Sequence, residues 1–374
     1  MATATNGSVG FRLLDLDIQD FRGIDRLHLD FRDETDEPIP LIVLAGDNGC
    51  GKTAVLEAIL LLLARDDLLP EDAAPLKEQI RFGAENFRLQ ANLRGVDQPT
   101  PSDALCWRVY QPPSPFERPQ FFTVGPNGQQ PWPIPAGWRG AFRGDSWPRV
   151  EYFSARREPV RLGHTPYKVD GRARDEGQRL ANLKRLLINS FYRRNRRGST
   201  TEKGVSPFER LQRFWTRFST KNQTLDVLPA SNNPGSGDEV VLRDATQPIP
   251  EDITSLEQAR ELSATRSDIP KLLTLDRLSS GQVALFAFAG PLVFSDRPAD
   301  FVLIDEPEQH MHTSWQRLII PALRELSPTS QFIVATQSEE ILSQALSYER
   351  FILIGDADPR ASLSSESGSN EAQS

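Results

Sequence analysis

The stretch Gly46-Asp47-Asn48-Gly49-Cys50-Gly51-Lys52-Thr53 decides the fold of this chain of 374 residues. It fits the pattern G-x-x-x-x-G-K-[ST], follows the apolar run Leu41–Leu44 and precedes the helix-like run Ala54–Leu61. A glycine loop between a buried strand and a helix turns backbone N–H groups toward a phosphate, and the helix N-terminus adds a favourable dipole. We therefore expect this whole stretch to bind a nucleoside triphosphate, with Lys52 reaching the β- and γ-phosphates and the Thr53 hydroxyl binding Mg²⁺.

Two segments far downstream carry further polar groups that suit phosphate chemistry. The apolar run Phe301–Ile304 ends in Asp305 and Glu306, which we expect to hold the water shell of Mg²⁺ and to deprotonate an attacking water, respectively. The segment Ser279-Ser280-Gly281-Gln282 opens an apolar run, and a helix starting there would direct a hydroxyl and N–H groups toward a terminal phosphate. Taken singly, the first pattern is also typical of any buried strand that ends in a polar loop, and the second of an ordinary N-cap.

The order of these motifs resembles that of the ABC-type ATPases. The phosphate loop, the Leu-Ser-Ser-Gly-Gln segment, Asp-Glu and then Thr-Gln-Ser follow one another as in the RecF/Rad50/SMC branch and its compact prokaryotic relatives, which include the ATPase half of OLD-family proteins. Within residues 11–95 and 270–355, Phe11–Phe31 resembles the opening β-hairpin, Asp305–His312 the catalytic strand and D-loop, and Ser330–Ser338 the switch strand. The resemblance implies an α/β fold, a P-loop NTPase of the ABC ATPase head type with a mixed sheet, an antiparallel β lobe and a helical insertion.

The resemblance also implies ATP and Mg²⁺ as cofactors, and an ATPase whose catalytic residues are Glu306 and Gln337. The family usually has His at the position of Gln337, where it contacts the γ-phosphate. Because the amide of Gln donates a hydrogen bond but cannot become charged, we expect either that hydrolysis is slow or that the site works mainly as a binding switch.

Three further sets of residues are candidates for the nucleotide site by the same resemblance. Arg22 lies in the hairpin turn Phe21–Ile24 and is a candidate for contact with the nucleotide. Gln90 is a candidate for the Q-loop ligand of the metal. The signature residues are expected to cap the nucleotide of a second copy: Ser279, Ser280, Gly281 and Gln282.

A single phosphate loop and a single signature imply that a complete pair of sites needs two chains. We expect a homodimer with head-to-tail C2 symmetry that forms on ATP binding and is released by hydrolysis.

The sequence divides into five expected segments. Residues 1–95 form the first half of the ATPase head, 96–160 a Pro/Trp-rich β lobe, 161–269 a basic helical insertion and linker, 270–355 the second half of the head, and 356–374 a disordered tail. The β lobe is expected because residues 99–148 hold 11 of the 29 prolines, a density that opposes helices. Arg156 or Arg157, at its end, is a candidate to report on bound phosphate, with a structural salt bridge as the alternative.

The net charge of −8 conceals a basic block, because residues 151–221 hold 18 Lys and Arg against 7 Asp and Glu. An apolar stripe of Phe208, Leu211, Trp215 and Phe218 within it is typical of helix packing. The arginines could bind a phosphate backbone or a protein partner, or form a solvated face. The candidates for DNA contact are Arg185, Arg193, Arg194, Arg196 and Arg197.

Composition limits the setting and the function. Cys50 and Cys106 make no disulfide framework, and we find neither a signal peptide nor a membrane-spanning run, so a cytoplasmic location is expected. The sequence shows no coiled-coil heptads, no zinc spacing and no nuclease motif of its own. The favoured function is an ATPase that acts on DNA or a nucleic-acid-processing partner, in repair or antiphage defence. The alternative is an ATP switch that controls a separately encoded nuclease or toxin; a transporter subunit is disfavoured by the long interval between Thr53 and Leu278.

Overall fold

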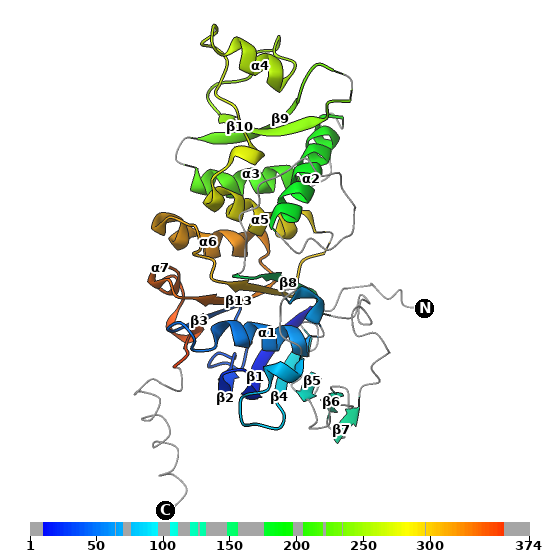
Figure 1. Ribbon diagram of the computed structural model, residues 1–374, viewed down its shortest axis with the longest axis vertical. Coiled ribbons are helices and arrows are strands. Elements are labelled where there is room, and N and C mark those ends of the chain that lie inside the picture. The colour runs from blue at the N-terminus through cyan, green and yellow to red at the C-terminus, as the bar shows by residue number, and fades with distance from the viewer. Residues whose placement is uncertain are drawn as a thin grey trace, which may run out of the picture. The chain divides into compact units, whose positions relative to one another are not determined.

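The computed structural model describes the chain in two compact units (Figure 1). Unit 1 comprises Met1–Ala155, Pro298–Glu308 and Thr329–Ser374, and unit 2 comprises Arg156–Arg297 and Gln309–Pro328. The five segments expected from the sequence remain predictions, and the expected tail 356–374, Arg156, Arg157 and Arg197 lie outside the described residues. Those described are 10–63, 65–69, 76–95, 105–110, 120–125, 128–131, 148–155, 176–196, 205–219, 222–233, 235–295 and 297–354.

The centre of unit 1 is a parallel sheet of strand order β14-β3-β13-β12-β8. Residues of β3, β12 and β13 are buried throughout, as expected of strands covered on both faces. The sheet places segments side by side that are hundreds of residues apart in the sequence. Its strands are β3 (Leu41–Ala45), β8 (Val150–Phe153), β12 (Phe301–Asp305), β13 (Gln331–Thr336) and β14 (Arg350–Ile352).

A second sheet of unit 1 is antiparallel, with strand order β2-β1-β4-β5-β6-β7. In its first hairpin, apolar and polar residues alternate along the strand as the sequence indicates: Leu16 and Ile18 are buried, and Asp17 between them is half-buried. The mixed α/β architecture predicted from the sequence is thereby confirmed. The strands are β1 (Phe11–Phe21), β2 (Ile24–Asp30), β4 (Arg88–Gly95), β5 (Leu105–Tyr110), β6 (Gln120–Gly125) and β7 (Gly128–Pro131).

Helix α1 (Lys52–Leu62) joins the two sheets of unit 1, because it contacts β12 and β13 as well as β1 and β4. Nearly all of its residues are buried, which is typical of a helix that is apolar all round. The short helices of this unit are η1 (Asp66–Leu68), η2 (Leu76–Gln79), α7 (Glu339–Leu342) and η5 (Ser347–Glu349).

Buried polar side chains tie the first strand to the parallel sheet. The Gln331 amide is fully buried; its oxygen accepts from Leu13 N at 2.8 Å, and its nitrogen donates to Leu13 O at 3.0 Å and Ile39 O at 2.9 Å. The Asp300 carboxylate accepts from Phe11 N at 3.1 Å and Arg149 N at 2.7 Å. These contacts fix the relative position of the two sheets within unit 1.

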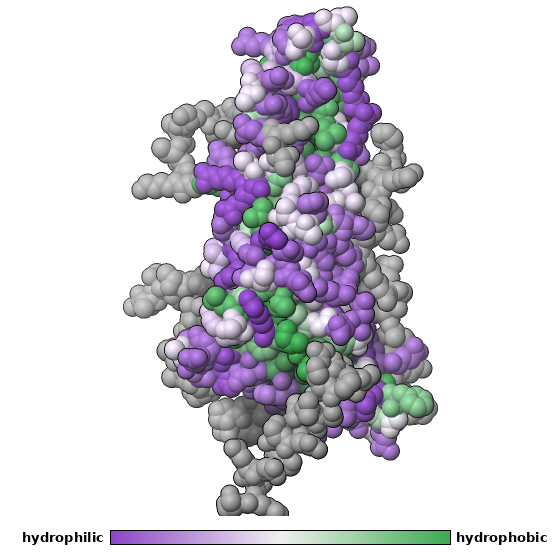
Figure 2. Space-filling view, turned by 90° about the vertical axis from the view of Figure 1, so that its left-hand side faces the viewer, coloured by the Kyte–Doolittle hydropathy of each residue, from purple (hydrophilic) through white to green (hydrophobic). Residues whose placement is uncertain are grey.

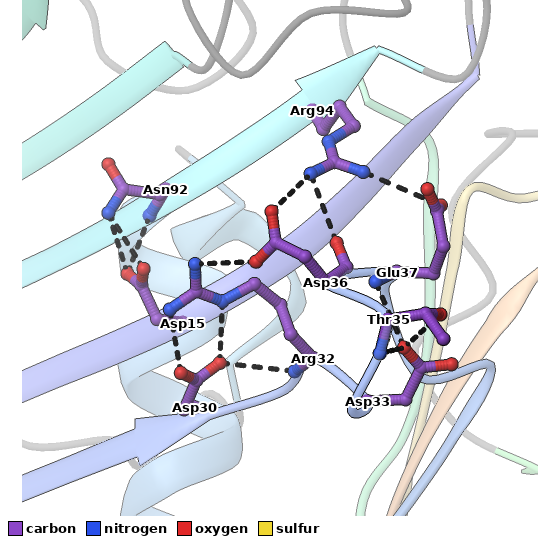
Figure 3. Close-up of polar contacts among 9 residues, drawn as sticks. All are labelled: Asp15, Asp30, Arg32, Asp33, Thr35, Asp36, Glu37, Asn92 and Arg94. Atoms are coloured by element: carbon purple, nitrogen blue, oxygen red, sulfur yellow. Dashed lines mark hydrogen bonds and ion pairs between the residues drawn. The ribbon is translucent and has the colours of Figure 1, made fainter.

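A charged network joins the end of β2, the loop between β2 and β3, and β4 (Figure 3). The Arg32 guanidinium donates to Asp30 at 2.6 Å and to Asp36 at 3.0 Å, and Arg94 pairs with Asp36 at 3.6 Å and with Glu37 at 3.4 Å. The hydrogen bond from Arg32 lowers the pKa of Asp30. Because these side chains are partly exposed, we assign the network to local order of the loop between β2 and β3.

Unit 1 also exposes an apolar surface near its last described residues. In Figure 2, apolar side chains gather on the face of unit 1 that carries α7 and β14. The large exposed apolar residues of this segment are Leu346, Tyr348, Ile352 and Ile354.

Unit 2 is built around helix α5 (Ser280–Phe294), which contacts α2 (Glu176–Arg196), α3 (Pro207–Phe218) and α6 (Thr313–Leu326). Trp215 of α3 stacks on Phe286 of α5, with ring centroids 4.8 Å apart. The aromatic stripe of α3 is buried, so its interpretation as packing is confirmed. The remaining elements are a sheet of β9 (Gln223–Pro229), β10 (Asp238–Asp244) and β11 (Leu273–Thr274), with α4 (Leu256–Leu262) and η4 (Leu275–Arg277).

Within the described part of the chain, no helix combines the length and the apolar character that crossing a membrane requires.

The buried amide of Gln331 gives a prediction about stability. We expect Gln331→Met to lower the free energy of unfolding by about 1–3 kcal/mol for each backbone group left unpaired. The groups at risk are Leu13 N, Leu13 O and Ile39 O. The midpoint of chemical unfolding measures the effect, with Gln344→Met as control, because the Gln344 side chain is exposed and bonds Ser343. Equal midpoints in the two variants would contradict the assigned role.

Candidate nucleotide-binding site

The loop between β3 and α1 has backbone conformations that require glycine. Gly46, Gly49 and Gly51 have φ of +150°, +81° and +97°. A Cβ on Gly46 would lie 2.4 Å from Leu353 O and 2.7 Å from Cys50 Sγ, and one on Gly51 would lie 3.1 Å from Ile24. A side chain at Gly46 would therefore displace the loop, as expected where backbone N–H groups must turn toward a ligand.

Lys52 lies across this loop. Its side chain is 6% exposed, and Nζ donates to Gly46 O at 2.7 Å and to Asp47 O at 2.8 Å. Nζ also lies 3.7 Å from Cys50 Sγ, so all three donors of the ammonium group face groups of the loop itself. The loop residues Asn48 and Gly49 are exposed, and Cys50 is half-buried.

The start of α1 meets the end of β12 through one hydrogen bond. Thr53 Oγ1 donates to Asp305 Oδ2 at 2.9 Å, and Asp305 is 1% exposed. In proteins, Mg²⁺ binds one or two carboxylates together with substrate phosphates and water. The adjacent hydroxyl of Thr53 and carboxylate of Asp305 are therefore suitable ligands. The residues present therefore fit the implied ion, with Thr53 and Asp305 to hold it.

Glu306 and Gln337, the residues expected to be catalytic, contact each other. Gln337 Nε2 donates to Glu306 Oε1 at 2.9 Å. Glu306 N donates to Ala335 O at 2.8 Å, and Glu306 has a left-handed backbone with φ of +47°. The structure thus places the proposed base against the switch strand.

Sequence reasoning missed Glu308, which accepts hydrogen bonds from both Thr336 and Gln337. Its place two residues after Glu306 was visible, but nothing in the sequence separated it from an ordinary loop acid.

Arg22 has partners that the sequence did not indicate. Its guanidinium forms an ion pair with Glu57 of α1, which is 4% exposed, and its Nε donates to Gln79 Oε1 at 3.2 Å. The nearby Tyr152 hydroxyl is buried, and burial, with smaller contributions from Asp305 and Glu57, raises its pKa. Arg22 thus belongs to a buried polar cluster, and its contact with a nucleotide remains a prediction.

Gln90 lies in the middle of β4, opposite Asp17 of β1. Its amide oxygen accepts from Arg88 Nη2 at 2.9 Å. Its assignment as a metal ligand remains a prediction.

The signature residues of unit 2 begin α5 with a capping box. Ser279 Oγ accepts from Gln282 N at 3.4 Å, and Gln282 Oε1 accepts from Ser279 N at 3.0 Å. A Cβ on Gly281 would lie 2.5 Å from His310 O, so the helix start approaches the D-loop backbone closely. Ser279 and Ser280 are exposed at this helix N-terminus.

The basic block is only partly described. Arg185 and Arg193 are exposed on α2, whereas Lys184 pairs with Glu239 at 2.7 Å and with Asp276 at 3.6 Å. Arg194 and Arg196 belong to the same helix, and their side chains lie outside the described part, as does all of Arg197. A hollow of about 530 Å³ beside α2 is lined by Asn189, Tyr192, Arg193 and Asp238.

Comparisons with known proteins agree with this geometry. Residues 41–343 match the model of the family AAA_21, described as "AAA domain, putative AbiEii toxin, Type IV TA system". A crystal structure of an SMC head bound to the C-winged helix domain of ScpA is similar at a TM-score of 0.55 and 15% identity, covering 89% of this chain and 92% of that one. A second SMC head, from Pyrococcus furiosus and bound to the C-terminal domain of ScpA, gives a TM-score of 0.52 at 14% identity, covering 90% and 92%.

Among curated proteins, the DNA replication and repair protein RecF of Anaeromyxobacter dehalogenans strain 2CP-1 is 40% identical over 85 residues. The match spans 22% of this chain and only 20% of the length of that relative. The family model covers most of the chain, and the solved structures share its fold. The chain therefore belongs to the AAA_21 family and has the fold of the SMC heads.

Proposed function

We propose that the protein binds and hydrolyses ATP, forms a head-to-tail homodimer when ATP is bound, and couples this cycle to DNA or to a nucleic-acid-processing partner. The observation that carries the proposal is the order β3-β13-β12 in the parallel sheet. Carboxyl ends of parallel strands meet at one edge of a sheet, which is where such folds bind ligands. At this edge Thr53 contacts Asp305, and Gln337 contacts Glu306.

The side chains at this edge divide the chemistry among them. Lys52 and the N–H groups of the glycine loop bind phosphate oxygens, and Thr53 and Asp305 hold Mg²⁺, which when bound offsets phosphate charge. Glu306 takes a proton from the attacking water. The Gln337 amide orients the Glu306 carboxylate, with which it shares a hydrogen bond of 2.9 Å. Because this amide stays neutral, we propose that turnover is slow.

The base assignment gives a prediction for Glu306→Gln. We expect phosphate release from Mg·ATP to fall by roughly 10²–10⁴-fold, the usual contribution of a general base, while ATP affinity stays within about threefold. Steady-state phosphate release and titration with a fluorescent ATP analogue measure the two quantities. Glu339→Gln, an exposed acid of the same unit, is the matched control. Equal turnover in Glu306→Gln and wild type would remove Glu306 from the base role.

The proposed dimer is supported by the exposure of Ser279 and Ser280 at the start of α5. Hydroxyl and N–H groups at a helix N-terminus suit a terminal phosphate, and in the proposed dimer that phosphate is bound to the second copy.

We expect Glu306→Gln to change from monomer to dimer when Mg·ATP is added, as measured by light scattering. In the Glu306→Gln protein, the further substitution Ser280→Arg should abolish dimer formation, because the long side chain would fill the space that the phosphate needs. Ser263→Arg, at an exposed end of α4, should not. A dimer that forms equally with and without ATP would refute nucleotide-driven assembly.

The ATP cycle could act on either of two kinds of partner, DNA or a separately encoded protein, and observations on α2 bear on both. The exposed Arg185 and Arg193 support contact with a phosphate backbone, as in a protein of DNA repair such as RecF. The ion pairs of Lys184 with Glu239 and Asp276, and Asp238 beside Arg193, lower the local positive charge and favour a protein partner. A separately encoded nuclease or toxin is the second candidate, in line with the toxin named by the family description.

Binding to duplex DNA separates the two outputs. If DNA binds at α2, we expect Arg193→Glu to weaken binding and to reduce the dependence of affinity on salt by about one phosphate contact. Fluorescence anisotropy at several salt concentrations measures both, with Arg260→Glu, an exposed residue of α4, as control. ATP turnover that is independent of DNA, together with co-purification of a second polypeptide, would favour the effector instead.

A further inference from the structure

Glu308 uses both of its carboxylate oxygens on two successive residues at the end of β13. Thr336 Oγ1 donates to Glu308 Oε2 at 2.8 Å, and Gln337 N donates to Glu308 Oε1 at 2.7 Å. Thr336 is fully buried, and its hydroxyl oxygen also accepts from Ser338 N at 2.9 Å. Because Ser338 supplies a donor to this hydroxyl, the single Thr336 proton is directed at Glu308.

The same residue, Gln337, is thereby held at two points. Its backbone N–H is bound by Glu308, and its side-chain amide donates to Glu306 at 2.9 Å. The backbone of Glu306 is held in turn by the bond from its N–H to Ala335 O. The end of β12 and the end of β13 are thus connected by a closed set of hydrogen bonds.

These hydrogen bonds hold Glu306 in a left-handed backbone conformation. A non-glycine residue with φ of +47° is strained and persists where its surroundings hold it. A carboxylate at position 308 accepts both donors, whereas an amide would present an N–H group to one of them. The geometry therefore favours an acid at position 308, because only a carboxylate accepts hydrogen bonds from both Thr336 and Gln337.

We propose that Glu308 is a positioning residue that sets the orientation of Gln337 against the base Glu306. This inference rests on the proposed hydrolysis of ATP, and it assigns Glu308 no contact with nucleotide or water. When Glu308 is removed, Gln337 and the base lose their fixed relation, while the phosphate loop keeps its structure.

A double-mutant cycle between Glu308 and Gln337 tests the proposal. We expect Glu308→Ala to lower kcat for ATP hydrolysis by about 10–100-fold, since a displacement of about 1 Å can cost 10²-fold, with ATP affinity unchanged within about threefold. In a Gln337→Ala background the further loss from Glu308→Ala should be under about threefold, because its effect passes through Gln337. Equal and additive losses in the two backgrounds would overturn the proposal, as would a loss of ATP affinity equal to the loss of kcat.

Two conservative changes keep the test independent of gross unfolding. Glu308→Gln retains one acceptor and should give a smaller loss than Glu308→Ala. Thr336→Val removes the buried hydroxyl and should lower kcat. Thr336→Ser keeps a hydroxyl and should keep kcat near the wild-type value. Glu339→Gln, an exposed acid at the start of α7, is the control for loss of a charge in the same segment. Equal kcat in Glu308→Gln, Glu308→Ala and wild type would overturn the proposal.

Amide hydrogen exchange distinguishes failure of this inference from failure of the proposed function. In the full chain without nucleotide, Glu308→Ala should speed exchange at Gln337 by about tenfold or more relative to α1 amides, because the N–H loses its acceptor. Unchanged exchange there would overturn the proposal even if ATP is hydrolysed. Absence of ATP hydrolysis in wild type would refute the proposed function, and faster exchange at Gln337 would then still support the positioning contact.

Discussion

The hydrogen bond from Thr53 to Asp305 joins the two halves of the candidate nucleotide site, although 252 positions separate these residues in the chain. It exists because β3 and β12 are parallel strands of one sheet, with β13 between them, so that their carboxyl ends lie at the same edge. This constraint of sheet topology places the glycine loop, the two acids and the switch residue together. If the strand order were different, the same motifs would not form a site.

The sequence predicted the elements that depend on local pattern. The glycine loop, the apolar strands around it and the aromatic stripe of α3 have periodicities or residue types that specify their structure without distant partners. It did not predict the ion pair between Arg22 and Glu57, because a charge within the apolar helix α1 gives no sign of which distant residue neutralises it. Gln331 and Glu308 were missed for the same reason, since their partners come from other strands.

The signature illustrates how one short segment serves local structure and candidate function together. Ser279 and Gln282 satisfy each other's groups in a capping box, and Gly281 is packed against the D-loop backbone. Their immediate role is therefore to start α5 in a fixed orientation. Ser280 is exposed and takes no part in the capping box. Its hydroxyl is therefore not used to start the helix.

The contact between Gly46 and Leu353 has a consequence for where the ATPase ends. Leu353 N donates to Ala45 O at 2.7 Å, and its carbonyl lies against the first glycine of the phosphate loop. A minimal fragment truncated before this residue would keep every recognisable motif and still lose the backbone that supports the loop from behind. The C-terminal boundary of an active fragment must therefore be placed beyond β14, although the last motif ends at Ser338.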